Sequence, residues 1–491
     1  MRKHVRDQIV DLLSTLWEGI KYASNTQSRQ AFVVLEDCVA AVNSISDTLQ
    51  AGLSTERFAV YDKTLTRLKH LLEAINGTIV NGQSAAQAVK ECKSLLGLLK
   101  KDLARESEVK LEVVFMPYKA SMWDSLESIW LAASEDERCN AIVVPIPYYD
   151  RNPDRSFGAF HYEGGEFPDY VPIVHYDNYD VSKHNPDVIY IHNPFDEYNL
   201  VTSVEPQFYS YNLKKNTQML VYVPYFISGA YPDVQSFAQK HLTANLPATD
   251  KIIVQSNMHK KLYMESGVKE NKLLALGSPK FDMIANINNM KVDIPTTWTE
   301  KIIDKKSIVL NSSVGSLLSY PNYLIELKDR ISTILSYPEL VLIWRPHPLL
   351  EATISSMRPD LHDEFREIIH MVENSDNAII DRLSSTLPAT VVSDGMISDI
   401  SSWARQYIAT GKPVLFLNGK SEMKKERLCV FDHFSSYFIK DGFGIEDFCN
   451  MVINGTDKKK DARMTDLKNS IANVDGSSGQ KIHKRIVSML V

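Results

Sequence analysis

Cysteine is scarce in this sequence, and its spacing argues against the usual cysteine-based sites. Five cysteines are spread over 491 residues, and none of them forms a Cys-x-x-Cys pair or another metal-binding spacing. An odd, sparse set is typical of a reduced, cytosolic protein. No cluster of carboxylates demands a metal, so we expect no metal ion and no cofactor to be essential. The cysteines are Cys38, Cys92, Cys139, Cys429 and Cys449.

Long apolar runs are missing as well. No stretch reaches the roughly 20 apolar residues that a membrane-spanning helix needs. The first four residues are basic, but Asp7, Asp11 and Glu18 interrupt the segment that follows, which therefore lacks the apolar core of a signal peptide. We expect a cytoplasmic protein whose contact with a membrane, if any, is peripheral and at the inner face.

An excess of positive charge is also absent. The formal net charge is −7, which gives no general electrostatic reason to bind nucleic acid or an anionic membrane. The length is too great for one hydrophobic core and suggests about three domains, at roughly 100–200 residues each.

Proline is absent from the first 108 residues, and this region has the periodicity of helices. Val5, Ile9, Leu12, Leu16 and Ile20 recur at spacings of three and four residues and form one apolar stripe. Three or four antiparallel helices would bury this stripe and the similar ones that follow. We predict a helical bundle over 1–108, which is either a packed bundle without a catalytic role or a module for oligomerisation or partner docking.

From residue 109 onwards, short β-rich runs alternate with helices, which indicates an α/β fold with parallel sheets. We predict one Rossmann-like domain over 109–288 and a second over 289–491, which ends in a helix at 464–490. Two such domains in a GT-B arrangement leave a cleft between them, and ligands bind there at the carboxyl ends of the strands. The predicted strands are 111–115, 141–146, 171–175, 188–192, 219–223, 251–255 and 273–276, then 307–310, 340–344, 378–380, 390–392 and 413–417.

A proline-stiffened loop, Arg345-Pro346-His347-Pro348, follows the predicted strand 340–344. An arginine can bind a phosphate through two hydrogen bonds, and a histidine near its pKa can donate to a phosphoryl oxygen or move a proton. A lone histidine is more often a structural hydrogen-bonding group, but the strand end and the adjoining arginine favour a functional interpretation.

A second polar segment, residues 393–402, follows the predicted strand 390–392. It contains the carboxylates of Asp394 and Asp399 and the hydroxyls of Ser398, Ser401 and Ser402. Ser and Asp are favoured N-cap residues, so we expect a helix to start here. Its first-turn amides and its dipole would attract an anion such as a diphosphate. The alternative is an ordinary N-cap whose serines satisfy the backbone.

These segments resemble those of the CDP-glycerol glycerophosphotransferase family, the polymerases and primases of teichoic-acid synthesis, which have a GT-B fold. The family's Arg-x-His-Pro loop is matched at 345–348, and its Asp-(three residues)-Thr-Asp-Tyr-Ser-Ser segment and following Lys-Pro strand are matched at 394–402 and 412–413. Its Gly-x-Pro-Arg-x-Asp segment is similar to residues 277–282. The resemblance covers about 223–417 and leaves out the region before 109.

Two family features are changed in this chain. The Trp-His-Gly segment of the first Rossmann domain, whose histidine is the proposed base, corresponds to residues 221–226, which contain no histidine. His192 ends the predicted strand 188–192 and is a candidate substitute, with a structural histidine on a loop as the alternative. The family's aromatic-Pro-Thr segment becomes Asn311-Ser312-Ser313.

The resemblance implies a transferase that moves a phosphorylated polyol, such as glycerol phosphate, from a CDP-activated donor to a hydroxyl of a cell-surface glycan or a teichoic-acid-type acceptor and releases CMP. The first Rossmann-like domain would then face the acceptor and the second would bind the donor. The predicted catalytic residues are His347 and, as the substitute base outside the matched region, His192. The predicted donor-binding residues are Arg345, Asp394, Ser398, Asp399, Ser401, Ser402 and Lys280.

Two other functions stay open at this point. The same two-domain cleft would suit a GT-B glycosyltransferase that uses a nucleotide sugar, since a fold does not fix a function. The missing Trp-His-Gly histidine also permits a catalytically idle nucleotide-binding or assembly protein whose helical domain recruits partners.

Overall fold

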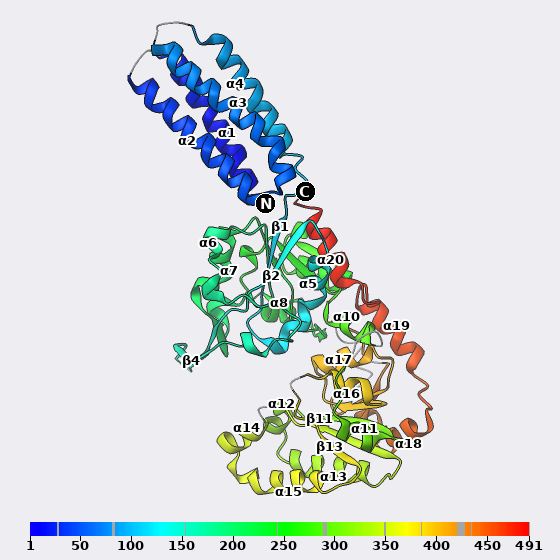
Figure 1. The fold of residues 1–491 in the computed structure, drawn as a ribbon. Coiled ribbons are helices and arrows are strands. Elements are labelled where there is room, and N and C mark those ends of the chain that lie inside the picture. The colour runs from blue at the N-terminus through cyan, green and yellow to red at the C-terminus, as the bar shows by residue number, and fades with distance from the viewer. Residues whose placement is uncertain are drawn as a thin grey trace.

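The structure, a computed structural model, describes residues 1–26, 29–80, 84–152, 154–242, 244–287, 292–347, 350–383, 385–419, 428–433 and 435–490. They form a helical bundle and two α/β domains in a row, with the first α/β domain in the middle (Figure 1). The predicted fold class, two Rossmann-like domains in a GT-B arrangement behind an all-α bundle, is confirmed. The predicted boundary at 288–289 lies outside the described residues.

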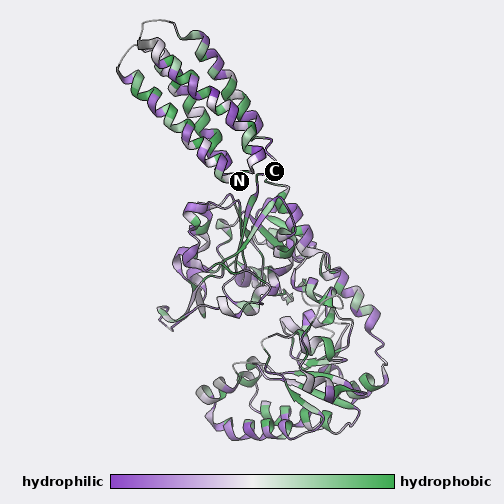
Figure 2. Ribbon diagram, in the orientation of Figure 1, coloured by the Kyte–Doolittle hydropathy of each residue, from purple (hydrophilic) through white to green (hydrophobic). Residues whose placement is uncertain are grey.

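The bundle consists of α1 (Lys3–Ser24), α2 (Arg29–Gly52), α3 (Thr55–Val80) and α4 (Ala86–Leu103). Figure 2 shows hydrophobic and hydrophilic residues alternating along these helices, and the hydrophobic ones form a shared core. Backbone hydrogen bonds from Lys3 N to Lys110 O and from Lys110 N to Met1 O, both 2.9 Å, fasten the bundle to the start of the first sheet. Across the described part of the chain, none of the helices has the length and apolar character that crossing a membrane requires.

The first α/β domain contains a parallel six-stranded sheet in the order β10-β9-β7-β5-β1-β2. The order reverses between β1 and β5, which makes their carboxyl ends the place where this type of sheet binds ligands. The strands are β1 (Leu111–Met116), β2 (Cys139–Val143), β5 (Val188–Ile191), β7 (Met219–Tyr222), β9 (Lys251–Val254) and β10 (Leu273–Ala275). The helices are α5 (Glu127–Ser134), α6 (Val181–His184), α7 (Ser210–Leu213), α8 (Val234–His241), α9 (Asn257–Glu265) and α10 (Lys280–Ala285), and the 3-10 helix η1 (Ala120–Ser125) precedes α5.

The second α/β domain has a parallel sheet in the order β13-β12-β11-β14-β15-β17. Numbered along the chain, this is the Rossmann order 3-2-1-4-5-6, which reverses between β11 and β14. The strands are β11 (Lys306–Asn311), β12 (Leu340–Arg345), β13 (Ala378–Ile380), β14 (Gly395–Ser398), β15 (Val414–Phe416) and β17 (Tyr437–Phe438). The helices are α11 (Thr296–Ile302), α12 (Val314–Ser319), α13 (Tyr323–Leu335), α14 (Leu350–Met357), α15 (His362–Glu373), α16 (Leu387–Val392), α17 (Ser402–Ile408), α18 (Ile445–Asn454), α19 (Lys460–Ser470) and α20 (Ser478–Val487).

Smaller strand pairings complete the fold. The antiparallel sheet β4-β3-β6 projects from the first domain (Figure 1). A two-stranded sheet pairs β8 of the first domain with β16 of the second and so joins the domains. These strands are β3 (Tyr148–Arg151), β4 (Phe157–His161), β6 (Thr202–Val204), β8 (Ala230–Tyr231) and β16 (Leu428–Cys429).

Three sequence-based element predictions need correction. The predicted strand 390–392 is the end of helix α16, and the strand lies further on, in β14. The predicted strand 171–175 is a single bridge between Ile173 and Val143. The single helix predicted at 464–490 is divided into α19 and α20.

Helix α20, the last helix of the predicted 289–491 unit, packs against the first α/β domain. Ile482 and Ile486 of α20 are fully buried in the same core as Ile129 and Trp130 of α5. The chain thus crosses between the α/β domains more than once, which restrains how the two can move.

Candidate active site

The end of strand β12 carries Arg345, whose guanidinium is bound by protein groups. The side chain is 8% exposed. Its Nη1 forms an ion pair with Asp381 Oδ2 at 2.5 Å, and its Nη2 donates to Leu383 O at 2.7 Å. The guanidinium also lies over the Trp403 ring of α17, 5.5 Å from its centre. Arg345 thus fixes the loop after β13 against the end of β12, and its direct contact with a phosphate stays a prediction.

His347 lies two residues further along the same loop and is exposed. It lines a cavity of about 240 Å³ together with Arg345, Glu351 and Asp381. Desolvation lowers the pKa of His347 below its ordinary value and so favours the neutral imidazole, which carries one N–H donor. Pro348, the last residue of the predicted loop, lies outside the described residues.

Asp394 is at the wrong edge of the sheet for the predicted donor contact. It precedes β14, where its Oδ2 accepts from Ser307 N at 2.9 Å and its Oδ1 pairs with Lys306 Nζ at 3.0 Å. Lys306 and Ser307 begin β11. Because both strands start here, Asp394 lies at the amino edge of the sheet, away from the carboxyl edge where ligands bind. The prediction failed because strand β14 begins five residues later than the predicted strand.

We expect Asp394→Asn to leave transferase activity unchanged. The substitution removes one partly exposed ion pair, and the asparagine oxygen can still accept from Ser307 N. The expected loss of folding stability is about 1 kcal/mol or less. Steady-state rates and urea unfolding of the variant measure both quantities, and a large loss of activity with normal stability would return Asp394 to the active site.

Ser398 and Asp399 lie at the carboxyl end of β14, where the strand order reverses. Both side chains are buried. Asn311 Nδ2 donates to Ser398 Oγ at 2.9 Å, while the hydroxyls of Ser313 and Ser316 donate to Asp399 Oδ2 at 2.6 and 2.5 Å. Asp399 therefore holds the first turn of α12 next to the start of α17. These contacts give both residues a positioning role at the edge predicted to bind the donor.

Ser401 and Ser402 begin helix α17, as predicted. Ser401 is the N-cap residue, and its Oγ accepts from Ala404 N at 3.1 Å. Ser402 is the first residue of the helix. Both are partly exposed. The interpretation of Ser401 as an N-cap is confirmed, and a contact of either serine with a diphosphate stays a prediction.

His192, predicted as a candidate base with a structural histidine as the alternative, is 1% exposed. Tyr118 N donates to its Nε2 at 3.2 Å. Ser125 Oγ donates to Met122 O at 2.7 Å, so it accepts from His192 Nδ1, 3.2 Å away. Burial, together with the positive charge of Lys280, lowers the pKa of His192 to about 3. The ring is a neutral structural histidine.

Lys280 is buried and paired, and its role in donor binding stays a prediction. Its Nζ lies 2.6 and 2.5 Å from the two carboxylate oxygens of Asp124 in η1. Gln406 of α17 donates to Lys280 O at 2.6 Å and to Asp124 Oδ2 at 3.3 Å. These contacts join α10 and η1 of the first α/β domain to α17 of the second.

The rest of the 277–282 segment anchors the returning C-terminal helix. Gly277 has φ +97°, and a Cβ there would collide with Ala472 O, so only glycine fits this close approach. Asp282 accepts from the backbone N–H groups of Ser478 and Gly479, at 3.1 and 2.7 Å, at the start of α20. A carboxylate at a helix start satisfies otherwise unpaired amides. The segment therefore fastens the start of α20 to the first α/β domain.

A cavity of about 490 Å³ lies between the two α/β domains. One wall follows β1 and includes Trp123, Asp124 and Glu127, and the other includes Thr386 of the loop after β13 and Gln406 of α17. Glu127 belongs to none of the motifs recognised in the sequence. One sign of it is present in the sequence: Glu127 lies four residues after Trp123 and three before Trp130, within an apolar helical stripe.

The comparisons with known proteins concern the second half of the chain above all. Residues 228–488 match the family model described as CDP-Glycerol:Poly(glycerophosphate) glycerophosphotransferase. The match includes more than half of the 491 residues. The chain belongs to this glycerophosphotransferase family. It is therefore a transferase of the CDP-glycerol-dependent type.

Solved structures add information on the fold. A putative UDP-N-acetylglucosamine 2-epimerase from Listeria monocytogenes is 14% identical, with a TM-score of 0.53 over 78% of this chain and 97% of that chain. The wall teichoic acid polymerase TagF is also 14% identical, with a TM-score of 0.47 over 87% of this chain and 98% of that chain. No curated protein matches the chain in sequence.

The region that matches the glycerophosphotransferase family begins after the bundle and most of the first α/β domain. It includes His347 and the segment 394–402, whereas His192 and Glu127 precede it. The family match therefore gives no information on the acceptor-side residues before residue 228.

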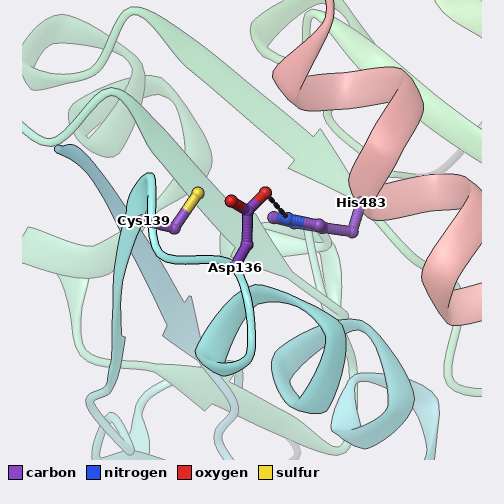
Figure 3. A group of neighbouring side chains, drawn as sticks. All are labelled: Asp136, Cys139 and His483. Atoms are coloured by element: carbon purple, nitrogen blue, oxygen red, sulfur yellow. Dashed lines mark hydrogen bonds and ion pairs between the residues drawn. The ribbon is translucent and has the colours of Figure 1, made fainter. Parts of the chain in front are cut away.

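One group of potential metal ligands occurs among the described residues, far along the chain from the family motifs. Asp136, Cys139 and His483 have ligand atoms within 4.8 Å of one another, and Figure 3 shows their side chains meeting between the α5–β2 turn and α20. His483 Nε2 pairs with Asp136 Oδ2 at 2.9 Å. Both Asp136 oxygens also accept from Arg138, at 2.9 and 2.7 Å. The Asp136 carboxylate is therefore already paired with Arg138 and His483, and the group holds α20 against the first α/β domain.

Proposed function

We propose that the protein transfers glycerol phosphate from CDP-glycerol to a hydroxyl of a glycan or teichoic-acid-type acceptor and releases CMP. One observation carries the proposal: the region that matches the glycerophosphotransferase family contains the carboxyl edge of the second sheet. There His347 follows β12, Ser398 ends β14, and residues 399–402 follow β14. Strand-order reversal between β11 and β14 supports ligand binding at this edge.

In this proposal His347 is the catalytic group on the donor side. Phosphoryl transfer depends mainly on in-line positioning and on stabilising the charge of the transferring group. The neutral imidazole donates a hydrogen bond to a phosphoryl oxygen, and Ser401 and Ser402 contribute the polar start of α17. Arg345 supports the site indirectly, because its ion pair with Asp381 holds the loop that lines the His347 cavity. The proposed reaction uses no cofactor.

Calorimetric titration tests the donor. We expect CDP-glycerol to bind with higher affinity than CMP, UDP-sugars or GDP-sugars, and His347→Ala to weaken that binding because a donated hydrogen bond to the diphosphate is lost. Preferential binding of a nucleotide sugar would contradict the proposal and favour glycosyl transfer. CDP-ribitol in the same series distinguishes glycerol from a longer polyol.

A further inference from the structure

The cavity between the two α/β domains lies where the first sheet is built to bind a ligand. Its wall from the first domain is formed by η1 and the start of α5, which directly follow β1. The strand order of this sheet reverses between β1 and β5, and ligands bind outside the carboxyl ends at such a point. The opposite wall includes Ser385 and Thr386 of the loop that Arg345 fixes. A ligand here would lie between the acceptor-side domain and the proposed donor site.

The charges of this cavity argue against a diphosphate. Three carboxylates, those of Asp124, Glu127 and Glu166, line it. The charge of Asp124 is neutralised by Lys280, whose Nζ lies 2.6 Å from Asp124 Oδ1. Glu127 instead accepts a hydrogen bond from the neutral hydroxyl of Tyr170 through its Oε1. Carboxylates accept hydrogen bonds from hydroxyls and repel phosphate oxygens. The cavity therefore suits a neutral part of a substrate that carries hydroxyl groups.

Glu127 combines burial with contact to this cavity. It is 3% exposed, and it is the first residue of α5. Burial and the neighbouring Asp124 raise its pKa to about 7. A general base is most effective when its pKa is near the working pH. His192, the base predicted from the sequence, is also buried, but it is not among the residues that line this cavity. Its pKa is about 3, and both of its ring nitrogens are hydrogen bonded.

We propose that this cavity receives the hydroxyl-bearing end of the acceptor, a terminal glycerol unit of a polyol phosphate chain, and that Glu127 is the general base of the transfer. The inference rests on the proposed function. The acceptor hydroxyl gives its proton to the Glu127 carboxylate as its oxygen forms a bond to the glycerol-bearing phosphorus of CDP-glycerol. The bond between this phosphorus and the bridging oxygen breaks, and CMP leaves with the electron pair. Glu127 then releases the proton to solvent.

The test compares Glu127→Gln with Glu135→Gln, which changes an exposed carboxylate at the other end of α5. CMP release from CDP-glycerol is measured with a short poly(glycerophosphate) oligomer as the acceptor. We expect Glu127→Gln to lose about 10²–10⁴-fold in rate while CDP-glycerol binding and thermal unfolding stay as in the wild type. Glu135→Gln should keep the wild-type rate.

A pH profile tests the same residue without removing it. The wild-type rate should rise with pH through an apparent pKa near 7. Tyr170→Phe removes the hydrogen bond that stabilises the Glu127 carboxylate, so its profile should shift to higher pH. A Tyr170 with only a structural role would change the rate at all pH values and leave the profile in place.

The outcomes separate the two proposals. If the wild type transfers to the oligomer and folded Glu127→Gln keeps at least half of that rate, the assignment of Glu127 is overturned. If the wild type binds CDP-glycerol but does not transfer to the oligomer, the acceptor assigned to the cavity is wrong. If the wild type does not bind CDP-glycerol at all, the proposed function fails instead.

Discussion

Replacing His347 by alanine is expected to reduce glycerol phosphate transfer about 10²–10⁴-fold, the usual range for the loss of a positioned proton-transferring or hydrogen-bonding group. The side chain is exposed on the loop after β12 and lines the cavity of about 240 Å³. Its removal opens no hole in the core, so folding stability should stay the same. Rates of CMP release at saturating CDP-glycerol, together with urea unfolding, measure the two effects.

His362→Ala is the matched control for this variant. His362 begins α15 in the same domain and is partly exposed, outside the residues that line the cavity. It should keep the wild-type rate. Unchanged turnover in His347→Ala would remove the histidine from the mechanism, and an equal loss in both variants would indicate a general effect on the second α/β domain.

The second large effect is a loss of folding stability between pH 7 and pH 5. Burial lowers the pKa of His192 and of His241 to about 3, and it lowers that of His259 well below 6.5. Their unfolded pKa is about 6.5, so the unfolded chain binds more protons in this window and stability falls as pH falls. His192 and His241 each contribute about 2 kcal/mol of this loss at pH 5, and His259 changes stability in the same direction.

Glu127 acts in the opposite direction. Its folded pKa of about 7 lies above the unfolded value, so the folded protein binds its proton first and gains stability as pH falls from 7 to 5. Urea unfolding at both pH values is therefore best measured in Glu127→Gln. His192→Gln in this background should reduce the pH dependence, whereas His370→Gln, at an exposed position of α15, should not. A flat profile would contradict the assignment of neutral, buried histidines.

Periodicity in the sequence was enough for the fold class. The spacing of Val5, Ile9, Leu16 and Ile20 predicts one buried face of α1, because a helix places such positions on the same side. Runs such as residues 340–344 are apolar throughout, as expected of strands covered on both faces of a parallel sheet. The bundle and most strands were therefore predictable.

For one short apolar run, the same reasoning predicted the wrong type of element. Residues 387–392 contain three β-branched residues and were predicted to end in a strand, but they form α16. A run this short fits a buried helix or a strand equally well, and only its packing decides between them. The error also moved Asp394 to the wrong edge of the sheet.

By itself, the sequence determined the architecture and the order of the motifs, and it made His347 a candidate, because these depend on local periodicity and on residues that are near neighbours in the chain. Only the tertiary structure decided which charged groups are paired with one another. Arg345 meets Asp381, and Lys280 meets Asp124, across 36 and 156 residues. Pairing at such separations depends on how the sheets and domains pack. The same packing places Glu127 at the cavity between the domains, where the Tyr170 hydroxyl is its hydrogen-bond donor.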